Sequence, residues 1–266
     1  MVPVEDDGSA NFVVPAEANV FLQVLDENYM ALQTERTFVN YMPGEVRSCV
    51  GCHETPSGVT SSEGAGQLKK ALKREPSIPG PQPGETDGHR ALDYAHDVQP
   101  VFDKYCQKCH SGAEPKGKLD LSGVLTEQFN TSYDALLPAA FERRDELLGL
   151  IVAENVPKTG NVAYLPAMSL GARTSVLVAM LSKGKVKLAD AKKAAHAAKL
   201  TEVHKDITLA PEELLKITNW IDTNCQYYGT YWGRKNLQYK DHPQFRPVAT
   251  FKMATSMASP VPENQR

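Results

Sequence analysis

The stretch Tyr105-Cys106-Gln107-Lys108-Cys109-His110 contains two cysteines separated by two residues, with a histidine directly after the second. The stretch Cys49-Val50-Gly51-Cys52-His53 repeats this pattern, so four of the five cysteines fall into two identical frames. This spacing is that of a c-type haem attachment site, where both thiols bond the haem and the adjacent histidine binds the iron. We therefore predict two haem c groups. They would be attached through Cys49, Cys52, Cys106 and Cys109, with His53 and His110 as axial iron ligands.

Two other kinds of site explain these frames less well. A structural zinc site also combines paired cysteines with histidine, but its histidines normally lie farther along the chain. A redox Cys-x-x-Cys pair accounts for the thiols but gives no reason for a histidine at the next position, twice. The frames therefore favour haem over zinc or thiol chemistry.

Composition limits the remaining classes. The chain has 266 residues, 41% of them hydrophobic, and a net charge of -3. Its basic residues form no patch apart from the segment 183–205, so we expect no nucleic-acid binding. No apolar run is long enough to cross a bilayer, so no membrane span is expected.

The compartment follows from the haem prediction. Because c-type haems are attached outside the cytoplasm, we expect an extracytoplasmic protein. The first residues lack a charged leader and an apolar segment, so the chain is expected to be a mature protein or the tail of a longer one.

The pattern predicts an α+β protein with a small antiparallel β module first. Strand-like alternation over residues 9–39, broken by turn residues at 26–28, leads into the first haem motif. We place this β-rich domain at 1–60 and a proline- and glycine-rich linker at 61–92, with a short helix at 67–73.

An all-α, cytochrome c-like domain is predicted at 93–235. Val98, Val101, Phe102 and Tyr105 share one helical face that runs into Cys106. A terminal helix at 211–222 has proline and acids in its first turn and would pack against the first helix over a haem. Further helices are expected at 139–154, 173–181 and 189–200, and an extended tail at 236–266.

The second protein ligand of the iron decides what each haem can do. An iron with two protein ligands carries electrons, whereas an iron with one protein ligand has an open position for a substrate. For the second haem, Met168 lies in a loop typical of a methionine ligand, although most methionines are core residues. His204 lies in a loop before the terminal helix and is equally well read as a surface histidine. The other candidates are expected to be exposed or structural: His96, His196 and His242.

For the first haem, the candidates are Tyr41, Met42 and residues from the second domain, and nothing in the sequence ranks them. We expect an open or weakly filled iron there. Cys225, the odd cysteine, is interpreted as a buried, unreactive thiol at a helix end.

Several stretches together carry a family resemblance. Asp7–Ala16, Phe21–Asp26, Leu32–Phe38 and Pro43–Glu54 resemble the middle domain of the hydrazine synthase alpha subunit family of planctomycetes. Residues 95–102 with the second motif, and then 220–224 and 227–231, are similar to the carboxy-terminal haem domain of that family. The resemblance covers most of the chain between residues 3 and 235, except the linker and the lysine-rich segment.

The resemblance implies that the chain corresponds to the carboxy-terminal part of a longer subunit whose first part is a β-propeller. It implies two histidine ligands on the last haem, which favours His204 over Met168. It also implies that the middle-domain haem is a reaction centre whose iron is bound by a tyrosine after the motif. Residues 54–59 contain no tyrosine, so this mark of the catalytic haem is missing here.

These inferences leave two functions open. In the first, the first haem is a reaction centre for small nitrogen compounds, which would make the chain an oxidoreductase, and the second haem transfers electrons. In the alternative, both haems only transfer electrons. Expected partners are a redox protein and other subunits of a larger complex. By resemblance, the compartment is periplasm-like or the anammoxosome.

Overall fold

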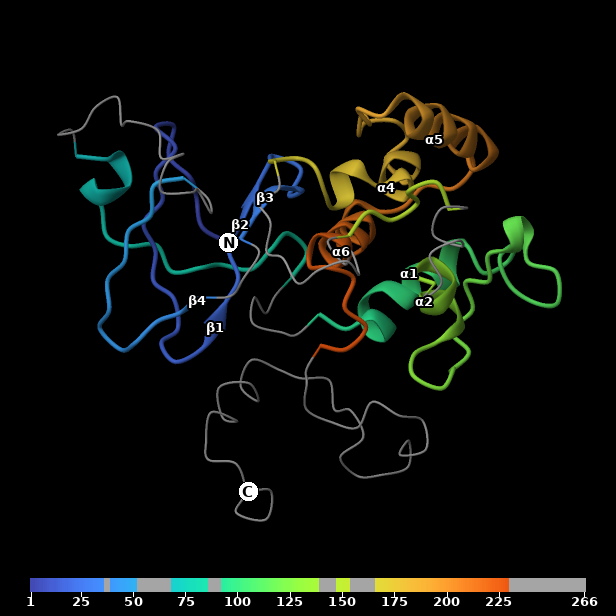
Figure 1. Ribbon diagram of the computed structural model, residues 1–266, viewed down its shortest axis with the longest axis horizontal. Helices are drawn as coiled ribbons and strands as arrows, with labels where there is room; N and C mark the ends of the chain where they lie inside the picture. Colours follow the sequence, from blue (N-terminus) through green and yellow to red (C-terminus); the bar gives the residue numbers. More distant parts are fainter. Residues whose placement is uncertain (36–38, 52–67, 86–91, 139–146, 154–165, 230–266) are drawn as a thin grey trace, which may run out of the picture. The chain divides into compact units, whose positions relative to one another are not determined.

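The computed structural model describes residues 1–35, 39–51, 68–85, 92–138, 147–153 and 166–229. It has the α+β composition that the sequence predicts, with two small two-stranded sheets and a set of mostly short helices (Figure 1). The chain divides into two compact units. The first contains Met1–Val24 and Gln33–Arg90, and the second contains Leu25–Leu32 and Ala91–Ala249.

The amino-terminal segment of the chain forms short strands. β1 (Asn19–Val20) pairs antiparallel with β4 (Val39–Asn40), with Val20 opposite Val39. β2 (Gln23–Leu25) and β3 (Ala31–Thr34) form the other sheet, in which the Gln23 amide donates a hydrogen bond to the Thr34 hydroxyl, 3.1 Å away. The antiparallel β module is thus confirmed, although its strands are shorter than the alternation suggested.

Residues 68–85, within the stretch predicted as a linker, form hydrogen bonds with the first residues of the chain. Within these residues, a single 3-10 turn, η1 (Lys70–Lys73), buries Ala71. The backbone N–H of Lys70 donates to the Asp7 carboxylate, and Ser77 and Asn11 are joined through their backbones. The hydrogen bonds that Asp7 accepts, from the Lys70 N–H and then from the Ser9 hydroxyl, lower the pKa of Asp7 to about 2, because they stabilise its charged form. The domain boundaries themselves stay predictions.

The described part of the second unit consists mainly of helices and helical turns. A π-helical turn, η2 (Tyr94–Val98), continues directly into α1 (Gln99–Tyr105), and η3 (Lys116–Lys118) and α2 (Thr131–Leu136) follow. After η4 (Ala172–Thr174) come α4 (Val176–Leu181), α5 (Ala191–Val203) and α6 (Pro211–Asp222). The helices expected at 173–181, 189–200 and 211–222 are therefore present within a few residues. The helix expected at 139–154 lies largely outside the described residues.

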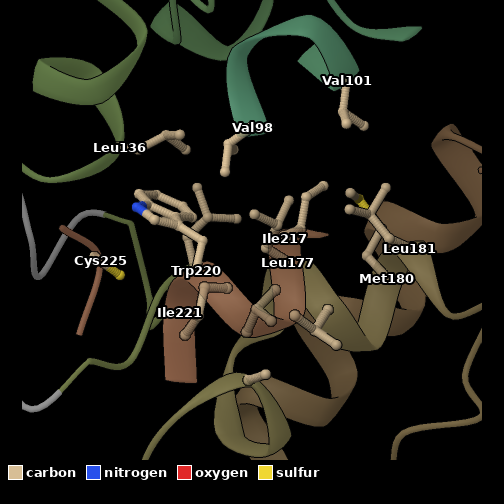
Figure 2. Close-up of a cluster of buried hydrophobic side chains, with 14 of the residues drawn as sticks. Val98, Val101, Leu136, Leu177, Met180, Leu181, Ile217, Trp220, Ile221 and Cys225 are labelled. Carbon is tan, nitrogen blue, oxygen red and sulfur yellow. The ribbon is translucent and has the colours of Figure 1, made fainter. Parts of the chain in front are cut away.

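The core of the second unit lies between α1, α4 and α6, as Figure 2 shows. Trp220 and Ile217 are fully buried on α6, and the Trp220 ring lies toward Val98 and Leu136 (Figure 2). All six residues of α4 are buried, which explains its uniformly apolar sequence. The shared apolar face predicted for the segment before Cys106 is confirmed, since Val98, Val101 and Phe102 are buried.

The tip of the β2–β3 hairpin belongs to the second unit. Asp26 fixes its turn, because its carboxylate accepts the backbone N–H groups of Asn28 and Met30 at 2.8 and 3.0 Å. Asp26 also forms an ion pair with Arg173. The turn residues predicted at 26–28 are therefore confirmed. No helix within the described ranges is long and apolar enough to cross a membrane.

Candidate cofactor site

The second motif lies at the end of α1 and continues its turns. Cys106 donates its backbone N–H to Phe102, and both Cys109 and His110 donate theirs to the Cys106 carbonyl, at 3.1 and 3.0 Å. Wound in this way, the motif leaves Cys109 exposed and Cys106 half-buried. Burial raises the pKa of the Cys106 thiol to about 11, so this side chain is in its neutral form at neutral pH.

The ring of His110 has one nitrogen engaged by the backbone. Its Nδ1 lies 3.1 Å from the carbonyl oxygen of Leu119, and the Leu121 N–H donates to the His110 carbonyl at 2.7 Å. A hydrogen bond from Nδ1–H to a carbonyl fixes the tautomer and leaves Nε2 as the basic nitrogen. His110 is therefore oriented as a metal ligand through Nε2.

The ring of His204 is also oriented by a hydrogen bond between its Nδ1 and a backbone carbonyl. His204 is the residue that ends α5, and its Nδ1 lies 2.8 Å from the carbonyl oxygen of Leu200, one turn earlier. Lys183 donates its ammonium to the backbone carbonyls of His204 and Lys205, at 2.9 and 2.7 Å. The ring therefore also presents Nε2, on a backbone that Lys183 secures.

The structure brings these two rings together. Their centroids are 6.0 Å apart and their planes are 15° from parallel. This is a loosely stacked pair. Two metal–imidazole bonds of about 2 Å each, plus the offset from each nitrogen to its ring centre, would also give about this separation. The separation of the two rings is therefore large enough for one metal atom between them.

That metal would need most of its ligands from elsewhere. Among the described residues, no group of three or more histidine, cysteine or acidic side chains is placed to hold a metal ion. Two facing imidazoles suit an iron whose other four positions are filled by a macrocycle, and the cysteines needed to attach one lie in the same turn as His110. The donor set therefore fits haem better than a bare ion.

The other ligand candidates have different surroundings. Met168 has a left-handed backbone and a side chain that is 53% exposed, and its N–H donates to the Leu32 carbonyl. His96 is held at 2.9 Å by the carboxylate of Asp93, with its ring mostly exposed. His196 lies within α5, and His242 lies outside the described residues. Which side chain binds iron stays a prediction, and the geometry favours His204.

The first motif is described only in part. Cys49 is exposed, whereas Cys52 and His53 lie outside the described residues. Of the two candidates for the far side of that haem, Met42 is 61% exposed and Tyr41 is half-buried with the Arg47 guanidinium 5.4 Å above its ring. Burial, and then the nearby Cys49 thiol, raise the pKa of Tyr41. Tyr41 is thus a neutral phenol close to the attachment cysteine.

Two acidic residues at opposite ends of α6 make structural contacts that the sequence did not single out. Glu213 accepts hydrogen bonds from the Tyr105 hydroxyl at 2.5 Å and the Lys104 ammonium at 2.8 Å, which ties the residues before Cys106 to the start of α6. Asp222 is buried at the other end of α6. Glu213 carried a weak signal as an acid in the first turn of a helix, whereas Asp222 carried none.

Cys225 is 2% exposed, as the sequence predicts. Burial raises the pKa of its thiol far above the ordinary value, so it remains protonated and unreactive. The aromatic cluster around it includes Tyr94, Tyr133 and Tyr227, whose rings are 5.0 to 5.5 Å apart. Cys225 is therefore part of the core, where its carbonyl accepts the Tyr133 hydroxyl.

An α+β protein whose helical unit brings two histidine rings to 6.0 Å, beside a pair of cysteines, belongs to a class that can hold a flat metal macrocycle between histidines. Comparison with known proteins narrows this class. Residues 1–54 match the family model of the hydrazine synthase alpha subunit middle domain. The hydrazine synthase subunit alpha of Kuenenia stuttgartiensis is 25% identical over 183 aligned positions, which cover 50% of this chain and 23% of that protein.

The solved structure of hydrazine synthase from the same organism matches 80% of this chain with a TM-score of 0.52, at 18% identity. The match covers 30% of that chain, so the present chain spans less than a third of the relatives it matches. The two sequence matches confirm the resemblance: the chain is similar to the hydrazine synthase alpha subunit. The structural match shows a likeness of fold.

Proposed function

We propose that the chain is a c-type redox protein with two haems. One is attached through Cys49 and Cys52 with His53 on its iron, and the other through Cys106 and Cys109 with His110 and His204 on its iron. The observation that carries the proposal is the 6.0 Å separation of the His110 and His204 rings, each with Nδ1 engaged by a backbone carbonyl.

The second site is proposed to transfer electrons. A bound haem would supply an iron that cycles between two oxidation states. His110 and His204 would both hold that iron through their imidazoles, which would leave no open position for a substrate. The carbonyl groups of Leu119 and Leu200, which lie beside the two Nδ1 atoms, would hold both rings in place during electron transfer and so limit reorganisation.

The first site is proposed as the reaction centre, acting on small nitrogen compounds in an oxidoreductase. Support comes from the match of residues 1–54, which include the first motif, to the middle domain of hydrazine synthase alpha. The half-buried Tyr41 lies near Cys49 and keeps its proton, so it can donate a hydrogen bond to a small molecule there. As part of a longer subunit, the chain would work with a redox partner and further subunits, in an extracytoplasmic compartment.

The haem content tests this proposal. A pyridine haemochrome assay on the chain, produced with the c-type maturation machinery, is expected to return two haems per chain. Cys49→Ser/Cys52→Ser and Cys106→Ser/Cys109→Ser are each expected to return one. A wild-type result of one or none would refute the assignment of the two motifs.

A ligand titration tests the division of roles. Nitric oxide, cyanide or carbon monoxide is expected to shift a high-spin component that is absent from Cys49→Ser/Cys52→Ser. A purely low-spin, unresponsive wild type would contradict the reaction-centre role and leave only electron transfer.

A further inference from the structure

One segment of the second unit is strongly positive, although the chain as a whole is slightly negative. Residues 183–205 contain seven lysines and two acidic residues, whereas the whole chain carries a net charge of -3. The lysines occupy the loop after α4 and the length of α5. We call the segment 183–205 the lysine face.

The two acids of the lysine face are already engaged. Asp190 begins α5 and accepts the backbone N–H of Lys193 at 2.9 Å, which lowers the pKa of Asp190. Glu202 pairs with Lys205 at 3.4 Å. Four further lysines are exposed and form no ion pair with any other described residue, so their charge is directed to solvent: Lys185, Lys187, Lys192 and Lys199.

The lysine face ends at the candidate iron ligand. His204 directly follows α5, whose 13 residues span about 20 Å. Lys183, at the other end of the segment, returns to donate its ammonium to the His204 carbonyl. The lysine face is thus connected to the backbone of His204 at both of its ends, through α5 and through the Lys183 hydrogen bond.

We propose that the lysine face is the docking surface for an acidic electron-transfer protein, which exchanges one electron per encounter with the haem between His110 and His204. This inference rests on the proposed haem at that site. A positive surface raises the encounter rate of a negatively charged partner by about tenfold or more at low ionic strength. An acidic protein is favoured over nucleic acid or an anionic membrane, because only a redox partner gains from contact beside His204.

Oxidation kinetics test the proposal with two small probes of opposite charge. The ferrous holoprotein is mixed in a stopped-flow instrument with anionic ferricyanide or with cationic tris(phenanthroline)cobalt(III), each of which accepts one electron from the ferrous iron. The phase belonging to the second haem is the one that remains in Cys49→Ser/Cys52→Ser. Lys192→Glu/Lys199→Glu is expected to lower the rate of haem oxidation by ferricyanide about threefold or more at 10 mM ionic strength. The same variant is expected to raise the rate of oxidation by the cobalt complex. The difference should vanish near 0.5 M salt.

Two controls isolate the position of the charge. Lys69→Glu/Lys73→Glu, on exposed residues of the first unit, makes the same change in net charge and is expected to alter both rates much less. Lys192→Arg/Lys199→Arg keeps the charge and should match the wild type. Equal effects at the two pairs of positions would overturn the proposal, and so would no effect at either.

A binding assay tests whether the lysine face instead binds an anionic membrane or nucleic acid. The oxidised holoprotein is assayed for binding to phosphatidylserine vesicles and to duplex DNA at 150 mM salt, and neither is expected to bind. Binding of either probe that Lys192→Glu/Lys199→Glu abolishes would overturn the proposal. The haemochrome assay tests the proposed function separately. If the second motif carries no haem, the proposed function is refuted. If it carries haem but the oxidation rates do not depend on the charge of the lysine face, only the docking surface is refuted.

Discussion

At the carboxyl end of α6, Asp222 accepts the backbone N–H groups of Ala31 and Ala172 at 2.9 and 2.7 Å. It joins the hairpin tip to the residues before α4, within the second unit. Gly171 allows this approach, because its φ of +84° and the space that a Cβ would share with the Asp222 carboxylate both exclude a side chain. Burial raises the pKa of Asp222 to about 6 despite the two N–H donors and nearby Arg173.

The raised pKa predicts a dependence of stability on pH. Because the folded-state pKa exceeds the unfolded value of about 3.9, the stability from this group is fully present below pH 3.9 and is lost as the pH rises through about 6. The loss amounts to about 3 kcal/mol. Asp222→Asn cannot ionise, and it gives up one of the two N–H acceptors at a cost of about 1 kcal/mol.

Urea unfolding at pH 4.5 and pH 7.5 measures this effect. The stability advantage of the wild type over Asp222→Asn is expected to shrink or reverse at the higher pH, and the comparison cancels all other titrating groups. A difference that stays constant with pH would show that Asp222 is ionised normally.

At the scale of elements, α1 and α6 meet through more than their apolar faces. Glu213 joins the last turn of α1 to the first turn of α6 through Tyr105 and Lys104, and it also accepts the Ala210 N–H at 3.1 Å. The hydrogen bonds from Lys104 and Tyr105 lower the pKa of Glu213 to about 2. The contribution of this carboxylate is therefore present above its unfolded pKa of about 4.3 and is lost as the pH falls toward 2.

Glu213→Gln keeps the shape of the side chain and removes the charge. We expect it to lower the free energy of unfolding at pH 7 by about 1 kcal/mol, because two charge-assisted hydrogen bonds weaken at a partly exposed site. Glu212→Gln, at the exposed neighbouring position, is expected to change it by less than about 0.5 kcal/mol. Equal urea midpoints for the two variants would mean that Glu213 does not link the helices.

At the scale of the whole molecule, local patterns predicted the elements but not the contacts between distant residues. The apolar periodicity of 98–105 and 211–222 predicted α1 and α6, because each helix buries one continuous face. The sequence predicted a spacer at 61–92, because no local pattern reveals the hydrogen bonds from Ser77 to Asn11 and from Lys70 to Asp7, which join residues more than 60 positions apart. The same limit hid Asp222, whose partners are 50 and 191 residues away.

The candidate site was predicted to a similar degree. The spacing of Cys106, Cys109 and His110 is local, so the sequence alone identified these residues. His204 is 94 residues from His110, and the residue pattern alone left it level with Met168 until the family resemblance favoured it. The geometry now adds independent support, since the His204 ring faces His110 while the Met168 side chain is half exposed.

The direct test of the central proposal is the spin state of the second haem after removal of each candidate ligand. In Cys49→Ser/Cys52→Ser, which retains only that haem, the ferric spectrum is expected to be low-spin and unresponsive to carbon monoxide when reduced. Adding His204→Ala should make it high-spin and able to bind carbon monoxide, because alanine cannot replace an imidazole on iron. Adding Met168→Ala should change neither property. The opposite pattern, with Met168→Ala opening the iron and His204→Ala leaving it low-spin, would contradict the pairing of His110 with His204.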